Sequence, residues 1–210
     1  MKIRRILAYH RIMQGKSPLC VSPDMFLWQM QYLKKKNISV GTLSEYLAKD
    51  VDVCLTFDDG WEDNFKNALP IIKRFGFNLT IFLTLRQIGA KNYLDWDIIR
   101  QMVKEKVEIG SHTISHPKLT RIPVDDAKKE IFQSRSILEE NLKIPVKYFC
   151  YPSGDYNKTI AGLVQQAGYQ AAVITPLVRM RESEFSMHRV GIYGHNGRLV
   201  FKIKLFGIYR

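Results

Sequence analysis

The chain has 210 residues, a length typical of a single domain. Hydrophobic residues make up 46% and charged residues 25% of the chain, which are globular proportions and exclude disordered, collagen-like and coiled-coil architectures. The 32 basic and 20 acidic residues give a formal net charge of +12, which favours anionic surroundings such as a membrane surface, a nucleic acid or an acidic polymer.

Short apolar runs alternate with longer amphipathic runs, a rhythm typical of βα units and a parallel sheet. In chain order the predicted elements are a strand at 6–9, a helix that follows Ser22, a helix at 42–49, a strand at 51–57, a helix at 64–75, a strand at 79–85, a helix at 96–106, a strand at 107–109, a helix at 125–142, a strand at 146–151, a helix at 158–167, and strands at 169–175 and 189–193. About seven strands with intervening helices, and no linker rich in Pro, Gly or Ser, predict one compact α/β domain over residues 1–210.

Polar side chains come directly after several predicted strands. In a parallel sheet the carboxyl ends of the strands share one edge, and in α/β barrels and open sheets that edge holds the site. The polar residues at these positions are His10, Asp58, Asp59, His112, His116 and Tyr151. Gly110 and Pro117 flank the two later histidines and argue against a helix there, but an extended or looped H-x-x-x-H can still direct two imidazoles at one ion. With a carboxylate, they form a ligand set that leaves coordination positions open.

The adjacent aspartates are predicted to have different tasks. Neighbouring side chains of an extended segment point in different directions, so one of Asp58 and Asp59 can bind the metal while the other faces the substrate as a base. A D-D-G triplet alone is typical of a turn, and a lone H-x-x-x-H is seldom a metal site. Their joint occurrence at successive strand ends favours a site.

Three motifs carry a resemblance to a known family. The sequences TFDDG at 56–60, SHTISHP at 111–117 and YPSG at 151–154 resemble the polysaccharide deacetylases of the NodB-homology type, carbohydrate esterase family 4. The sequences YHR at 9–11 and YLDWD at 93–97 are also similar to members of that family. The resemblance runs from about residue 6 to residue 193.

The resemblance implies a distorted (β/α) barrel of seven strands and one divalent metal ion, most typically zinc. By motif matching, Asp59, His112 and His116 bind the metal and Asp58 is the catalytic base. The implied reaction removes an N-acetyl group from an amino sugar in a glycan or glycolipid and releases acetate. The backbone N–H of Tyr151 is expected to stabilise the oxyanion that forms during attack.

The late part of the chain departs from the family pattern. Where many members have an Arg shortly before the Tyr-Pro, the nearby cation is Lys147. The common Leu-x-His motif is missing, because Ser186 stands two residues before His188. Related branches instead have an Arg ahead of an apolar strand, and Arg189 fits that form. We therefore expect Arg189 to face the barrel interior as the partner of Asp58, and His188 to lie at the surface.

The proton donor to the leaving amine must then come from another histidine. His195 lies in a Gly-His-Asn-Gly turn and is expected to point to solvent, whereas His10 follows a central strand. We predict that His10 is the catalytic acid, on the side opposite Asp58, since a histidine pKa of ~6.5 suits the role. The alternative is a buried structural histidine. Trp61 is predicted to stack on a sugar ring; Trp96 and Tyr156 are weaker candidates for which core packing is the alternative.

Functions of four classes are compared at this level. The first is the metal-dependent N-deacetylase, and the second is a non-catalytic glycan-binding module with the same barrel. A nucleic-acid binder is not expected, because no aromatic-basic motif of such modules is present. A non-haem iron oxygenase has a similar ligand set but leaves Asp58 without a role.

The chain ends and the charge bear on localisation. No apolar run approaches the ~18 residues of a membrane-spanning helix, and residues 1–10 do not hold the ~7–15-residue apolar region of a signal peptide. The apolar, lysine-containing tail at 199–210 is expected to pack on the barrel; the alternative is that it lies on an anionic membrane. We expect a cytoplasmic protein, with the inner face of the membrane as an alternative location.

Overall fold

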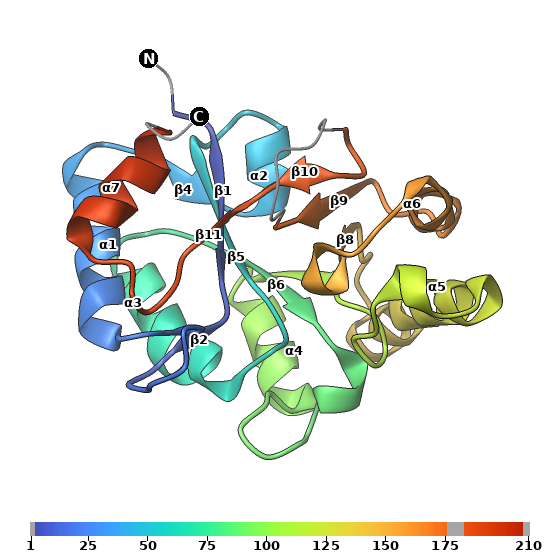
Figure 1. Ribbon diagram of the computed structural model, residues 1–210. Helices are drawn as coiled ribbons and strands as arrows, with labels where there is room; N and C mark the ends of the chain where they lie inside the picture. Colours follow the sequence, from blue (N-terminus) through green and yellow to red (C-terminus); the bar gives the residue numbers. More distant parts are fainter. Residues whose placement is uncertain (1–2, 176–182, 208–210) are drawn as a thin grey trace.

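The computed structural model describes residues 3–175 and 183–207 and shows a barrel of parallel strands with helices on its outside (Figure 1). The barrel strands are β1 (Arg5–Tyr9), β5 (Val53–Phe57), β6 (Thr80–Leu83), β7 (Glu108–Ser111), β8 (Tyr148–Cys150), β9 (Ala171–Ile174), β10 (Met187–His188) and β11 (Val190–Gly191). Their order in the sheet is β10-β9-β8-β7-β6-β5-β1-β11, and every pairing along it is parallel. The carboxyl ends of these strands therefore lie at the same end of the barrel.

The barrel is nearly closed by one extended segment that is interrupted at Arg189. Its first half, β10, pairs with β9, and the N–H of Arg189 donates to the carbonyl of Ile174 at 2.8 Å. Its second half, β11, pairs with β1, and the N–H of Ile192 donates to the carbonyl of Ala8 at 2.8 Å. Counting the two halves as one strand, the described residues form seven strands along this path. The predicted distorted (β/α) barrel of seven strands is confirmed.

The helices follow the predicted ranges closely. They are α1 (Pro23–Lys35), α2 (Leu43–Leu47), α3 (Leu69–Arg74), α4 (Trp96–Lys104), α5 (Val124–Leu142), α6 (Lys158–Gln166) and α7 (Arg198–Phe206). The side chains of Ser22, Asp95 and Asn157 each accept a hydrogen bond from the N–H three residues later, at 3.2, 2.8 and 2.9 Å. These bonds satisfy N–H groups that have no partner within the helix, which explains why α1, α4 and α6 begin at these positions.

The range 64–75, predicted as one helix, is divided in two. Residues Asn64–Ala68 form a π-helical stretch, η1, and α3 begins at Leu69. Pro70 has no N–H, and in a regular α-helix its ring clashes with the carbonyl four residues earlier. We attribute the wider π turn directly before it to this conflict.

Several short elements have no counterpart in the sequence analysis. Strand β2 (Arg11–Ile12) pairs with β3 (Cys20–Val21) in a separate parallel pair, and β4 (Val40–Gly41) pairs with β5. The 3₁₀ turns are η2 (Leu85–Gln87), η3 (Leu119–Arg121) and η4 (Pro152–Gly154). Two- or three-residue segments are too short to show a periodic pattern, which is why they were missed.

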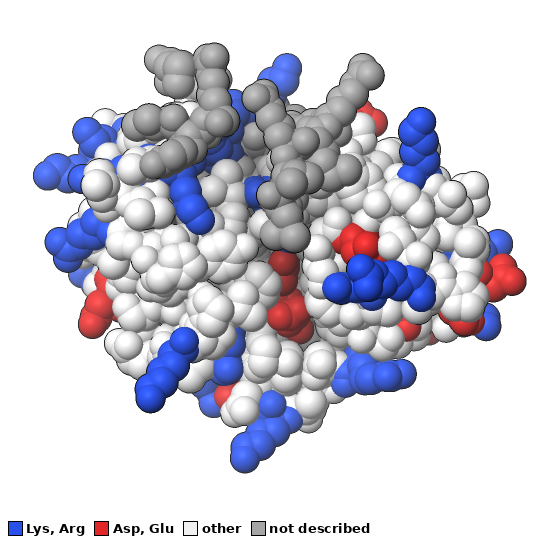
Figure 2. Space-filling model, in the orientation of Figure 1, with Lys and Arg blue, Asp and Glu red and all other residues white. Residues whose placement is uncertain are grey.

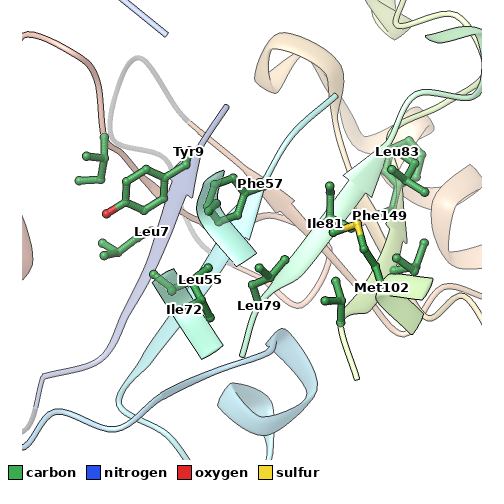
Figure 3. Packing of buried hydrophobic residues seen from close by; sticks show 14 of the residues in the cluster. Leu7, Tyr9, Leu55, Phe57, Ile72, Leu79, Ile81, Leu83, Met102 and Phe149 are labelled. Atoms are coloured by element: carbon green, nitrogen blue, oxygen red, sulfur yellow. The ribbon is translucent and has the colours of Figure 1, made fainter. Parts of the chain in front are cut away.

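The alternation of side chains along β5 explains both the core and the position of the site. Leu55 and Phe57 point outward, into the core between the strands and helices such as α3 and α4 (Figure 3). Cys54 belongs to a second cluster that includes two α2 residues. Because successive side chains of a strand face opposite sides, the same alternation carries Thr56 and then Asp58 into the barrel interior.

The tail packs on the barrel, as expected, and its described part forms the helix α7. Phe201 of α7 is fully buried, and its ring lies 6.1 Å from that of Trp28 and 6.4 Å from that of Tyr32, both on α1. Residues 208–210 lie outside the described residues. Leu199 is 70% and Val200 38% exposed on α7, so association with an anionic membrane stays an untested alternative. None of the helices in the described part of the chain is long and apolar enough to cross a membrane.

Candidate active site

The predicted site residues meet at the carboxyl end of the barrel. A cavity of about 400 Å³ opens there, and acidic atoms are visible in the hollow at the centre of the face in Figure 2. The predicted site residues that line it are His10, Asp58, Asp59, His112, His116, Tyr151 and Arg189. Trp61, predicted to contact the sugar, is not part of the lining.

Asp59, His112 and His116 face one point. The Oδ1 atom of Asp59 lies 3.7 Å from Nε2 of His112 and 3.7 Å from Nε2 of His116. These separations are too long for hydrogen bonds. Two ligands that each lie ~2.1 Å from one tetrahedral ion are about 3.4 Å apart, so the three side chains fit a shared metal ion.

The surroundings of His112 suit a metal ligand. Its Nδ1 lies 2.7 Å from the carbonyl oxygen of Cys150, which accepts the hydrogen bond and leaves the lone pair of Nε2 free. Burial lowers the pKa of His112 to about 4, although Asp58 and Asp59 oppose this shift. The imidazole is therefore neutral at pH 7, as metal binding requires.

The backbone is strained where it presents these side chains. Asp59, Thr113 and His116 have φ angles of 72°, 68° and 61°, in the left-handed region that non-glycine residues seldom adopt. Such conformations cost roughly 1–3 kcal/mol each and persist only where the surroundings impose them. The two neighbouring carboxylates have different contacts: Asp58 is paired with Arg189, whereas Oδ1 of Asp59 faces the two histidines.

Glu130 of α5 holds the loop between the two histidines. Its carboxylate accepts hydrogen bonds from the N–H groups of Ile114 and Ser115 at 2.8 and 2.9 Å, and from the Ser115 hydroxyl. The sequence analysis missed this residue, because a glutamate within a long amphipathic helix shows no local signal of such a contact.

Asp58 forms a bidentate ion pair with Arg189, the partner expected for it. Nη1 donates to Oδ1 and Nη2 to Oδ2, both at 2.7 Å, and Nη1 also donates to the hydroxyl of Thr56 at 3.1 Å. Burial alone disfavours ionisation of Asp58, but the charge and hydrogen bonds of Arg189, with smaller contributions from His112 and His10, hold its pKa well below the usual range. Asp58 is thus a buried carboxylate that stays ionised, with a side chain that is 4% exposed.

A second group of side chains, Asp58, His112 and Cys150, is also close enough to share an ion. Both Asp58 oxygens are already bound to Arg189, and Nη2 of Arg189 lies 3.1 Å from Sγ of Cys150. Burial raises the pKa of the Cys150 thiol well above its ordinary value, so it is not a thiolate. A cation is therefore expected at Asp59, His112 and His116 and not at this group.

His10 lies beside Asp58 and not across the site from it, which corrects the predicted arrangement. Its Nε2 is 3.9 Å from Oδ2 of Asp58, and its side chain is 23% exposed. Within residues 3–175 and 183–207, nothing hydrogen-bonds to its buried Nδ1. The backbone holds the residue here, since the carbonyl of His10 accepts from Nδ2 of Asn64 at 2.8 Å.

The two histidines near the end of the chain, His188 and His195, lie away from the cavity. His188 is half-buried in β10 and does not line the cavity, and His195 is exposed, with its ring stacked on Tyr193 at 5.7 Å. Lys147 precedes β8 and so lies at the amino end of the barrel, opposite the site. Neither His188 nor Lys147 takes the place of Arg189.

Tyr151 lines the cavity, but its N–H is not a free donor. It donates to the carbonyl of Val173 at 3.2 Å, and the phenol donates to the carbonyl of Phe185 at 2.9 Å. The predicted oxyanion role conflicts with this hydrogen bond, because the N–H of Tyr151 continues the pairing of β8 with β9 one residue beyond the last residue of β8. The ring lies 5.1 Å from that of Tyr156, which is half-buried.

Trp61 contacts protein groups where a sugar was expected. Its indole N–H donates to Oδ2 of Asp59 at 3.1 Å, its ring stacks on Tyr93 at 4.0 Å, and the Arg11 guanidinium lies 4.1 Å from it. These contacts compete with stacking on a substrate. Trp96 packs against the hydrophobic core, so the core alternative holds for it.

Solved structures share this barrel. The deacetylase PplD of Streptococcus pyogenes, determined in complex with acetate, superposes with a TM-score of 0.86 at 24% identity over 96% of this chain and 97% of that one. A structure from Bacillus anthracis, named as a polysaccharide deacetylase, gives 0.83 at 25% identity over 96% and 68%. The fold is thus that of the barrel deacetylases.

The sequence comparison narrows this class to a family. The family model described as polysaccharide deacetylase matches residues 48–172, more than half of the chain. YxkH of Bacillus subtilis (strain 168), whose name assigns it to the same family, is 30% identical over 197 residues, or 89% of this chain and 70% of that protein. The chain belongs to the polysaccharide deacetylases, the hydrolases of carbohydrate esterase family 4.

Two further relatives have more specific names. The peptidoglycan-N-acetylglucosamine deacetylase of Bacillus cereus is 25% identical over 58% of this chain. The poly-β-1,6-N-acetyl-D-glucosamine N-deacetylase of Staphylococcus aureus (strain N315) is 27% identical over 70% of it. The chain spans 55% and 58% of the lengths of these two proteins.

Proposed function

We propose that the protein is a metal-dependent hydrolase that removes N-acetyl groups from an amino sugar in a glycan or glycolipid and releases acetate. The convergence of Asp59, His112 and His116, next to a separate, buried and ionised Asp58, carries this proposal. The two relatives named for N-acetylglucosamine substrates support the substrate class. A non-catalytic glycan-binding module would need neither the ligand set nor the ionised aspartate.

We assign the metal to Asp59, His112 and His116, and zinc is the ion that such a set typically binds. When bound, the ion supplies Lewis acidity, which polarises an acetamide carbonyl and lowers the pKa of coordinated water. The Nε2 atoms of both histidines and the Oδ1 atom of Asp59 are the donors of this site. The carboxylate of Asp58 accepts hydrogen bonds from Arg189 on both oxygens and is not assigned as a metal ligand.

Asp58 is the base in the proposed reaction. As water attacks the acetyl carbon, a C–O bond forms and Asp58 accepts a proton from the attacking water. Arg189 holds Asp58 ionised and fixes the direction of its two oxygens, so no reorientation is needed before the proton moves. When the C–N bond breaks, the amine takes up a proton, and the products are acetate and the free amino sugar.

His10 is the proposed source of the proton for the amine. Its Nε2 faces the site and lies 3.9 Å from Asp58, and its ring lines the cavity. His10→Ala should lower kcat for acetate release by about a hundredfold or more, on the scale of a positioned general acid, with unchanged metal content. His188→Ala is the matched control, because His188 is also a half-buried histidine but lies outside the cavity. A large loss in His188→Ala with normal turnover in His10→Ala would overturn the assignment.

Acetate release tests the function directly. The protein should release acetate from N-acetylglucosamine oligomers or poly-β-1,6-N-acetylglucosamine, lose this activity in a chelator, and regain it with Zn²⁺, Co²⁺ or Ni²⁺. Binding of these glycans without acetate release under any of the three ions would favour the non-catalytic module. Activity that survives complete metal removal would contradict metal dependence while leaving the deacetylase assignment intact.

A further inference from the structure

Trp61 is the first residue after the turn that carries both aspartates, and it lies outside the cavity lining. Its indole Nε1 donates to Oδ2 of Asp59 at 3.1 Å, while Oδ1 of the same carboxylate faces His112 and His116. We infer that Trp61 is a positioning residue that orients Asp59 for metal binding by occupying one of its two oxygens. This inference rests on the proposed metal site.

The orientation of Asp59 needs such support. Its side chain is 18% exposed, so neither packing nor burial alone fixes the rotation of the carboxylate. Its backbone is already in a left-handed conformation, which makes its side-chain direction unusual for a residue at the end of a strand. A donor on Oδ2 leaves Oδ1 as the oxygen for a metal, a contact of the kind that tunes affinity behind the primary ligands.

The indole itself is held on its ring faces. Tyr93 stacks on it with a centroid separation of 4.0 Å and an interplanar angle of 25°, and the two residues also form an isolated backbone bridge. The guanidinium of Arg11 lies 4.1 Å from the ring, where a cation is attracted to the π system. Neither contact uses the N–H, which remains available to Asp59.

Arg11 is fixed in turn by a buried carboxylate. Its Nε donates to Oδ2 of Asp63 at 2.9 Å, and Oδ1 of Asp63 accepts from the N–H of Ile12 at 2.7 Å. Asp63 is 7% exposed and the Arg11 side chain 21%, so the carboxylate side of this ion pair is shielded from solvent. A continuous set of contacts therefore runs from Asp63 through Arg11 and Trp61 to the metal ligand Asp59.

The test is metal affinity, measured on metal-free protein by competition for Zn²⁺ with a chromophoric chelator. Trp61→Phe keeps an aromatic ring for Tyr93 and Arg11 but removes the N–H, and should weaken Zn²⁺ binding by about 10–100-fold. Trp28→Phe is the control, since Trp28 is a half-buried tryptophan on α1 that packs against Phe201; its affinity should equal that of the native chain. Native affinity in Trp61→Phe would overturn the inference.

Two further measurements separate positioning from a structural role. The melting temperature of metal-free Trp61→Phe should stay near that of the metal-free native chain. The increase in melting temperature on adding Zn²⁺ should be smaller in Trp61→Phe than in the native chain, and the visible spectrum of its Co²⁺ form should differ from that of the native Co²⁺ form. If Trp61→Phe does not fold, benzothienylalanine at residue 61 replaces only the N–H by sulfur, and unchanged affinity in that protein would refute the inference. Failure of the native chain to bind any of these ions would instead refute the proposed metal site.

Discussion

Asp58→Asn should remove most turnover, by about 10²–10⁴-fold, and leave the metal content near that of the native chain. The substitution keeps the shape of the side chain but removes the base, and both oxygens of Asp58 accept hydrogen bonds from Arg189 and are not assigned to the metal. Asp59→Asn should lose metal as well as activity, because the oxygen that faces His112 and His116 belongs to Asp59. The measurements are kcat for acetate release and metal content by elemental analysis.

Two controls accompany this pair of variants. Circular dichroism at pH 7 should show both folded, and excess Zn²⁺ should restore part of the activity of Asp59→Asn but none of that of Asp58→Asn. Equal loss of metal in the two variants would contradict the division of labour between the aspartates.

Arg189→Met should destabilise the protein by about 3–5 kcal/mol at pH 7, since removing one partner of a buried ion pair leaves an uncompensated charge. Both side chains are nearly inaccessible, at 2% for Arg189 and 4% for Asp58, so solvent does not screen the pair. The free energy of unfolding in urea measures this effect. The double variant Asp58→Asn/Arg189→Met should cost less than the sum of the single variants, because the residues are in direct contact.

The destabilisation by Arg189→Met should also depend on pH. In the native chain the folded pKa of Asp58 lies below its unfolded value of ~3.9, so its stabilising effect is present above that value and is lost as the pH falls through the folded pKa. Without Arg189, burial is the largest remaining influence and raises the folded pKa of Asp58 above the unfolded value. Protonation then relieves the buried charge, and the deficit relative to the native chain should shrink from pH 7 towards pH 4. A deficit independent of pH would contradict a charge origin.

Much of the fold was readable from local patterns. Short apolar runs marked β1 and β5, amphipathic runs marked the helices, and Ser22 marked the start of α1, because each signal depends on residues close together in the chain. The π-helical stretch before Pro70 and the two-residue strands were not predicted, since each depends on packing against the rest of the barrel.

The same distinction between local patterns and tertiary contacts applies to the site residues. The residue types at the strand ends, including Asp58, Asp59 and the two later histidines, were evident from the motifs, because a strand that ends at the carboxyl edge delivers whatever follows it to the site. Only the tertiary structure revealed three further features. These are the position of His10 beside Asp58, the hydrogen bond from the N–H of Tyr151 to Val173, and the contact of Trp61 with Asp59. Side-chain directions beyond a strand end depend on individual φ angles and on contacts between segments far apart in the chain, and a local pattern carries information on neither.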